Sequence, residues 1–175
     1  ICELLNLAYR GEDGWTTESD LVKGDRCSEN DIASDINTPS KHVLVYKTDN
    51  QIKACISVQK SENRAYIGAF AVHPKLQDSG FGRAILHLAE QYAVTRFESE
   101  EFIMVVLSSR IELIEYYERR GYRRNGNTKQ YPRHLNVGIP LNSDLMIEEL
   151  IKSALPVDQL SQQAVLTISL ARVKY

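Results

Sequence analysis

The sequence predicts one mixed α/β domain in which helices pack against a central sheet. Its 175 residues are enough to bury one hydrophobic core, and no internal repeat or low-complexity segment divides them, so we expect a single domain over residues 1–175. Strand-like and helix-like runs alternate along the chain. The run 83–97 carries apolar residues at three- and four-residue spacing, which is typical of a helix that lies on a sheet.

The first part of the chain predicts two helices. Residues 1–9 have the character of the interior of a helix. Ser28 can cap a second, short helix that ends near Thr38 and Pro39. Asp31 stands where a full capping box has Glu or Gln, so this start signal lacks one member of the motif.

The strands are expected from residue 42 onward. Thr48, Asp49 and Asn50 have the residue types of a tight turn, and they separate the strand-like runs 42–46 and 51–59, so this pair predicts a hairpin. The remaining elements are expected as strands at 64–73, 102–109, 122–131 and 145–151 and as a helix at 110–120.

A glycine-bearing turn, QDSGFG at residues 77–82, joins the strand 64–73 to the helix 83–97. Glycine lets the backbone approach a ligand closely, and the first N–H groups of a helix lack internal partners and carry the positive end of the helix dipole. The turn therefore favours an anionic, phosphate-bearing cofactor, although a plain turn capped by Asp78 or Ser79 has the same residues. No Gly-Lys-Ser/Thr follows and the third glycine of a dinucleotide fingerprint is missing, so neither of those motifs applies.

A second motif, YYERRGY at residues 116–122, ends the helix 110–120 at Gly121, where a left-handed C-terminal cap is expected. Together the two motifs resemble the GCN5-related N-acetyltransferase (GNAT) family. The segment 77–82 matches its acyl-CoA loop, Gln/Arg-x-x-Gly-x-Gly/Ala, and 116–122 matches its pattern aromatic-Tyr-x-x-x-Gly-aromatic, in the right order. The resemblance covers most of the chain. It implies the acyl-CoA N-acyltransferase fold, a central, mostly antiparallel mixed sheet with one parallel, splayed strand pair, flanked by helices.

The resemblance also implies an activity, the transfer of an acetyl group from acetyl-CoA to a primary amine of a small molecule or peptide. The backbone of residues 78–83 would hold the pyrophosphate, and the pantetheine arm would lie where the two parallel strands splay. Arg110 stands where many family members have asparagine, so we expect it to meet phosphate or to be solvated. The expected cofactor-binding residues are Phe70, Ala71, Val72, Gln77, Asp78, Ser79, Gly80, Phe81, Gly82, Arg83, Arg110 and Tyr116.

Tyr117 aligns with the family's tyrosine beside the departing sulfur, which makes it the expected general acid. A phenol with a pKa of about 10 can protonate a thiolate whose acid has a pKa of about 8.5, because exchange with solvent restores the phenol afterwards. The alternative is a core position for Tyr117, with Tyr116 facing the cleft. The general base is less determined, and its candidates are Glu18, Glu112 and His73, in that order.

Composition excludes several other classes of protein. The net charge is −2, from 21 basic and 23 acidic residues, so the chain has no broad electrostatic footprint for nucleic acid. No apolar stretch approaches the roughly 20 residues of a membrane span and no leader opens the chain, so we expect a soluble, cytoplasmic protein with no membrane partner. The three cysteines are odd in number and have no metal-type spacing with the four histidines, which predicts reduced thiols and no metal site.

The acceptor is only weakly indicated. Glu12, Asp13, Glu18 and Asp20 surround Trp15 in the sequence and could line an entrance for a cationic amine. Two rival classes stay open, a non-catalytic acyl-CoA-binding or interaction module on the same fold and a generic nucleotide-binding domain. Retention of both family motifs favours an enzyme.

The two ends of the chain depart from the family pattern. Family members begin with a strand before the first helix, whereas this chain begins with helix-like residues and carries a strand-like run at 164–170. We infer a circularly permuted order, in which 153–163 links the family's last and first strands and 171–175 continues as a helix into residue 1. The alternative is an ordinary additional strand at the C-terminal end.

Overall fold

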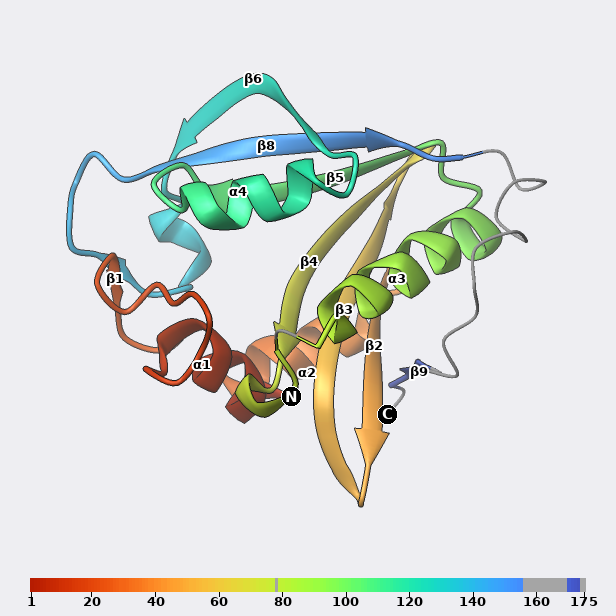
Figure 1. Ribbon diagram of the computed structural model, residues 1–175, viewed down its shortest axis with the longest axis horizontal. Helices are drawn as coiled ribbons and strands as arrows, with labels where there is room; N and C mark the ends of the chain where they lie inside the picture. The colour runs from red at the N-terminus through yellow and green to blue at the C-terminus, as the bar shows by residue number, and fades with distance from the viewer. Residues whose placement is uncertain (78, 156–169, 174–175) are drawn as a thin grey trace.

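The computed structural model describes residues 1–77, 79–155 and 170–173. Within them a mixed sheet has the strand order β6-β8-β5-β4-β3-β2-β9 (Figure 1). Its strands are β2 (Lys41–Thr48), β3 (Gln51–Ser61), β4 (Arg64–Val72), β5 (Glu101–Leu107), β6 (Arg123–Gln130), β8 (Met146–Ser153) and β9 (Ala171–Arg172). The helices are α1 (Cys2–Arg10), α2 (Glu29–Asn37), α3 (Phe81–Phe97) and α4 (Ile111–Glu118), with short 3₁₀ turns η1 (Pro74–Leu76) and η2 (Arg133–Leu135). A separate two-stranded ladder joins β1 (Val22–Lys23) to β7 (Ile139–Pro140).

The helices cover both faces of the sheet. Successive side chains of a strand point to opposite faces. On β3, Ile56 packs in the core with α3 and α4, while its neighbour Cys55 packs with Leu4 and Leu5 of α1 and with α2. Figure 1 shows the same arrangement, with α3 and α4 on one side of the sheet and α1 and α2 on the other. This two-sided packing confirms the expected fold class.

The local signals read from the sequence have clear structural counterparts. Asp49 and Asn50 both adopt left-handed backbone angles, φ 49° and 61°, in the turn that joins β2 to β3. Ser28 and Asp31 form a complete reciprocal capping box, so aspartate serves where glutamate is usual. Gly121 has φ +89° just after α4, as a left-handed cap requires.

The parallel strand pair splays apart, and this opening positions the site. Every other strand pair is antiparallel, but β4 and β5 run parallel and stay paired only as far as Tyr66 and Ile103. Beyond that point β4 contains a bulge, where Ala69 takes the left-handed angle φ 43° and the register with β3 shifts. Figure 1 shows the two strands meeting at one end and diverging at the other. Main-chain groups of β4 beyond Tyr66 therefore have no partner strand on that side among the described residues.

The C-terminal prediction is partly wrong. Ala171 and Arg172 are extended and pair antiparallel with β2 at the edge of the sheet. They are not the first turn of a helix, and α1 starts at Cys2 with Ile1 as its N-cap residue. Residues 164–169, 174–175 and most of the expected linker lie outside the described residues, so the permuted order stays a prediction.

Among the described helices, none is long and apolar enough to cross a membrane.

Candidate active site

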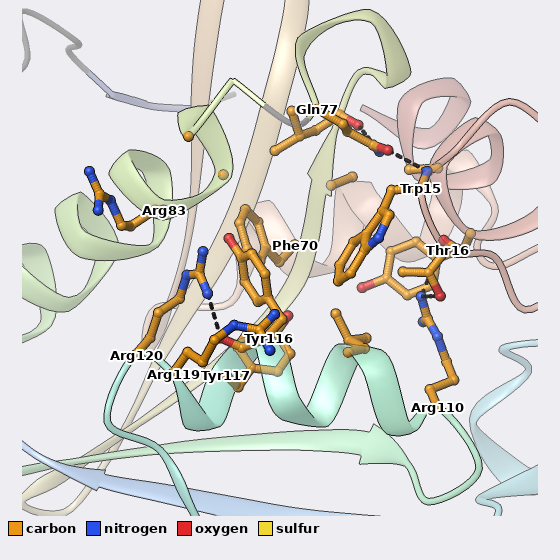
Figure 2. Close-up of a pocket in the computed structure, with 17 residues that line it drawn as sticks. Trp15, Thr16, Phe70, Gln77, Arg83, Arg110, Tyr116, Tyr117, Arg119 and Arg120 are labelled. Atoms are coloured by element: carbon orange, nitrogen blue, oxygen red, sulfur yellow. Dashed lines mark hydrogen bonds between the residues drawn. The ribbon is translucent and has the colours of Figure 1, made fainter.

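A cavity of about 410 Å³ opens where β4 diverges from β5. Its walls come from the end of β4, the start of α3, one side of α4 and the loop that follows α1 (Figure 2). Ten of the fourteen expected site residues line it, namely Phe70, Ala71, Val72, Gln77, Gly80, Gly82, Arg83, Arg110, Tyr116 and Tyr117. We call it the first cavity.

The N-terminus of α3 supplies unpaired donors to the first cavity. Gly80, with φ +78°, is the N-cap residue and offers no side-chain cap. The helix's own hydrogen bonds begin at Ala84, whose N–H donates to the Gly80 carbonyl at 3.2 Å, so the N–H groups of residues 81–83 find no acceptor among the described residues. Such a helix start binds anions through its free N–H groups and its dipole.

Gly82 is required by close packing. A Cβ built on it would lie 3.0 Å from the Tyr116 hydroxyl oxygen, and within ordinary contact of Phe70 and Val72. The absence of a side chain at residue 82 therefore lets the helix start lie this close to the tyrosine without displacing it. The cradle of free N–H groups and glycines fits a phosphate-bearing ligand.

Besides Arg110, three arginines line the first cavity and add positive charge to it. Arg83 was expected there, but Arg119 and Arg120 were not. The Arg120 guanidinium lies 3.2 Å from the centroid of the Tyr116 ring and donates to the Tyr116 carbonyl at 2.5 Å. Basic residues at the end of a helix are common because they suit the negative end of the helix dipole, so the two arginines carry no specific signal by themselves. Their position one helical turn after the pair Tyr116 and Tyr117, which the sequence already assigned to the site, is the signal that would have found them.

Gln77 fastens the loop after α1 to the strand. Its amide nitrogen donates to the Val72 carbonyl at 3.0 Å, and its amide oxygen accepts from the Trp15 backbone N–H at 2.6 Å. The Trp15 ring in turn lies against Tyr116, with centroids 5.5 Å apart. Figure 2 shows this chain of contacts closing one wall of the first cavity. Gln77 thus positions the wall through its side chain.

A second cavity, of about 140 Å³, lies on the other side of the strand opening, against β5 and the segment 131–137. It shares Tyr9, Phe70, Arg110, Leu113 and Tyr117 with the first cavity, so the two cavities meet at these side chains.

Tyr117 lies at that junction. Its side chain comes from α4 and is only 5% exposed, and its hydroxyl has no hydrogen-bond partner among the described residues. Burial raises the pKa of Tyr117 well above its ordinary value, which keeps the phenol protonated.

The family model of the acetyltransferase (GNAT) domain matches residues 18–136. The chain belongs to the GNAT acetyltransferase family. No curated protein matches it by sequence.

Solved structures share the fold of this GNAT domain at low identity. The ribosomal-protein-S18-alanine N-acetyltransferase from Escherichia coli is 19% identical over 80% of this chain and 84% of its own, with a TM-score of 0.61. A GNAT family acetyltransferase from Elizabethkingia anophelis with acetyl-CoA bound is 19% identical over 80% and 92%, with a TM-score of 0.60. A mutant of the spermidine N-acetyltransferase SpeG from Vibrio cholerae is 14% identical over 72% and 73%, with a TM-score of 0.56.

The carboxylate of Glu18 is clamped by two arginines in this GNAT domain. Oε2 accepts from Arg10 at 2.6 Å and Oε1 accepts from Arg110 at 2.8 Å, and all three side chains are about nine-tenths buried. Arg110 also donates to the carbonyl and hydroxyl oxygens of Thr16 at 3.3 Å. Arg110 is therefore neither solvated nor free for a phosphate, and it ties the start of α4 to the loop after α1.

The other expected residues fall into three groups. Glu18 lines the second cavity, whereas Glu112 and His73 line neither. Ser79 is exposed and donates to the Leu76 carbonyl, Phe81 packs its ring against Tyr46, and Asp78 lies outside the described residues. Three members of the expected acidic entrance, Glu12, Asp13 and Asp20, are exposed and line neither cavity.

Proposed function

We propose that this GNAT domain is an N-acetyltransferase that moves an acetyl group from acetyl-CoA to the primary amine of a small molecule or peptide. The observation that carries the proposal is the meeting of two cavities at Tyr117, whose hydroxyl has no hydrogen-bond partner among the described residues. One cavity has the anion-binding start of α3 on its wall, and the other leaves space for an acceptor. Acetyl-CoA supplies the acetyl group as a thioester.

The first cavity is the proposed cofactor site. The N–H groups of residues 81–83 and the guanidinium groups of Arg83, Arg119 and Arg120 would hold phosphate oxygens, since helix N-termini and arginine are the usual anion partners. The unpaired edge of β4 at Phe70–Val72 would hold the amide groups of the pantetheine arm.

The second cavity is the proposed acceptor site, and Tyr117 is the proposed general acid. The acceptor nitrogen forms a bond to the acetyl carbon as the carbon–sulfur bond breaks, and the Tyr117 hydroxyl gives its proton to the sulfur. The nitrogen releases one proton in the same reaction. Among the described residues, Glu18 is the one carboxylate that lines either cavity, so we propose that it accepts this proton through water. Exchange with solvent then returns a proton to the Tyr117 phenol and removes the one on Glu18. Each of its oxygens has a lone pair beyond the one that accepts from arginine.

The test is a thermal-unfolding series with acetyl-CoA, CoA, ATP and a dinucleotide, followed by a thiol-release assay with an amine panel. A ligand at 100 times its Kd stabilises the folded state by about 2.7 kcal/mol. At about 2–4 °C per kcal/mol for a chain of this size, acetyl-CoA should raise the Tm by about 5–11 °C.

The rival classes give different results in the same experiment. Protection by acetyl-CoA without thiol release for any amine would support the non-catalytic module. Stronger protection by ATP or the dinucleotide would support the nucleotide-binding domain and refute the proposal.

A further inference from the structure

The second cavity is positively charged. Among the described residues, the charged side chains on its wall are Glu18, Arg26 and Arg110. Arg10 lies behind the wall and pairs with Glu18. Three arginines and one glutamate give a formal charge of 3 − 1 = +2 around this space.

Arg26 differs from the other two arginines of this group in its contacts. Arg10 donates to three backbone carbonyls besides Glu18, and Arg110 donates to Glu18 and Thr16. The guanidinium of Arg26 makes no hydrogen bond or ion pair with any residue that the structure describes. It lies over the ring of Tyr9, 5.1 Å from the centroid, which holds the side chain in place.

The backbone of Arg26 is also fixed. Its N–H donates to the side-chain oxygen of Asn6 at 2.7 Å, and the next residue, Cys27, is buried. A half-buried guanidinium on a well-held segment lines a cavity in which the one carboxylate among the described residues, Glu18, already pairs with two other arginines. This arrangement suits recognition of an anion, since arginine binds carboxylate with two parallel hydrogen bonds.

We propose that Arg26 binds a carboxylate of the acceptor, so that the substrate is a compact amine that also carries a carboxylate. The proposal rests on the proposed function. Arg26 and Tyr117 line the same cavity, so one molecule can place its carboxylate at the first and its amine at the second. The cavity holds about 140 Å³, less than the roughly 300–1,000 Å³ of sites for drug-sized ligands, which selects a molecule about the size of an amino acid. A polyamine would enter a space that already carries a charge of +2.

The experiment measures thiol release from saturating acetyl-CoA with matched acceptors. Each amino acid is compared with its carboxamide and with the amine that lacks the carboxyl group, and spermidine and an aminoalkyl phosphonate complete the panel. With wild type, kcat/KM should fall about 10- to 150-fold from the acid to its carboxamide, the range for a lost hydrogen bond to a charged group. Higher activity with carboxamides, spermidine or the phosphonate, or no activity and no binding with any carboxylate-bearing amine, would overturn the proposal.

The matched variants separate this site from the cofactor site. Arg26→Gln should lose the preference for the acid over the carboxamide, and this loss should show as a higher KM for the acid. Thermal protection by acetyl-CoA should stay unchanged. Arg26→Lys keeps the charge and should recover part of the preference. Recovery would show that the loss in Arg26→Gln comes from the missing charge and not from misfolding. Arg96→Gln removes the same charge from an exposed position on α3 outside both cavities and should behave as wild type. An unchanged preference in Arg26→Gln overturns the Arg26 assignment alone, whereas loss of acetyl-CoA protection in wild type refutes the proposed function.

Discussion

Replacing Glu18 by glutamine tests the buried ion-pair cluster that joins α1 to α4. The carboxylate accepts one short hydrogen bond from each of two arginines, and the three side chains are 8–11% exposed. Glutamine has the same shape but a single oxygen, so one arginine would face an NH₂ group, donor against donor. Arg110 would be affected more than Arg10, because Arg10 retains three backbone carbonyls.

The size of the effect follows from this geometry. Removing one partner of a buried ion pair costs about 3–5 kcal/mol, since the remaining charge stays buried and uncompensated. Glutamine keeps one acceptor and Arg10 keeps its carbonyls, so we expect the lower end of this range, about 3 kcal/mol. At about 2–4 °C per kcal/mol, the Tm should fall by about 6–12 °C.

Thermal and urea unfolding of Glu18→Gln and Glu115→Gln provide the measurement and its control. Glu115 pairs with Arg119 on the surface of α4 at 3.9 Å, and the two side chains are 56% and 61% exposed. The same chemical change there should alter the free energy of unfolding by no more than about 0.5 kcal/mol. Equal stability of the two variants would show that the Glu18 cluster contributes nothing beyond a surface pair and would refute the reasoning.

Two further variants test the proposed catalytic roles. Tyr117→Phe should lower kcat by about 10²-fold and leave acetyl-CoA affinity near normal, while Tyr116→Phe keeps its rate. Because burial raises the pKa of Tyr117, its deprotonation should cause no loss of rate between pH 7 and 9, and a full-speed Tyr117→Phe variant would remove it from the mechanism. Gly82→Val places a side chain against the Tyr116 hydroxyl and over the start of α3, so the Kd for acetyl-CoA should rise at least about tenfold while the domain stays folded. Normal acetyl-CoA affinity in that variant would place the cofactor elsewhere.

The sequence predicted those parts of the fold whose cause is local. Apolar periodicity located α3, residue types located the turn at Asp49 and Asn50, and Gly121 marked the end of α4, because each depends on the conformational preferences of neighbouring residues. The loop 77–82 was found for the same reason, since the free donors of a helix start belong to the backbone.

The bulge at Ala69 could not be predicted from its residue. Alanine disfavours the left-handed angle that it adopts here, and the cause is the register shift between β3 and β4. The pairing of Glu18 with Arg110 spans 92 residues and carries no local signal. Arg26 likewise reaches the second cavity only through the packing of α1 and the loop that follows it. The helical expectation for Ala171 and Arg172 failed because pairing with β2 decides their conformation.

The two cavities differ in the groups that they present, main-chain donors of a helix start in the first and charged side chains in the second. This difference bears on how the domain could diverge or be redesigned. The helix N-terminus in the first cavity presents main-chain donors, and most substitutions leave those donors in place. The second cavity takes its charge from side chains at positions 18, 26 and 110, each of which one codon change can replace. Under the proposed function, acceptor preference is therefore free to change while the main-chain part of the proposed cofactor site stays in place. Under the same proposal, variation of Arg26, with α3 and Tyr117 held constant, is the direct route to new acceptors on this scaffold.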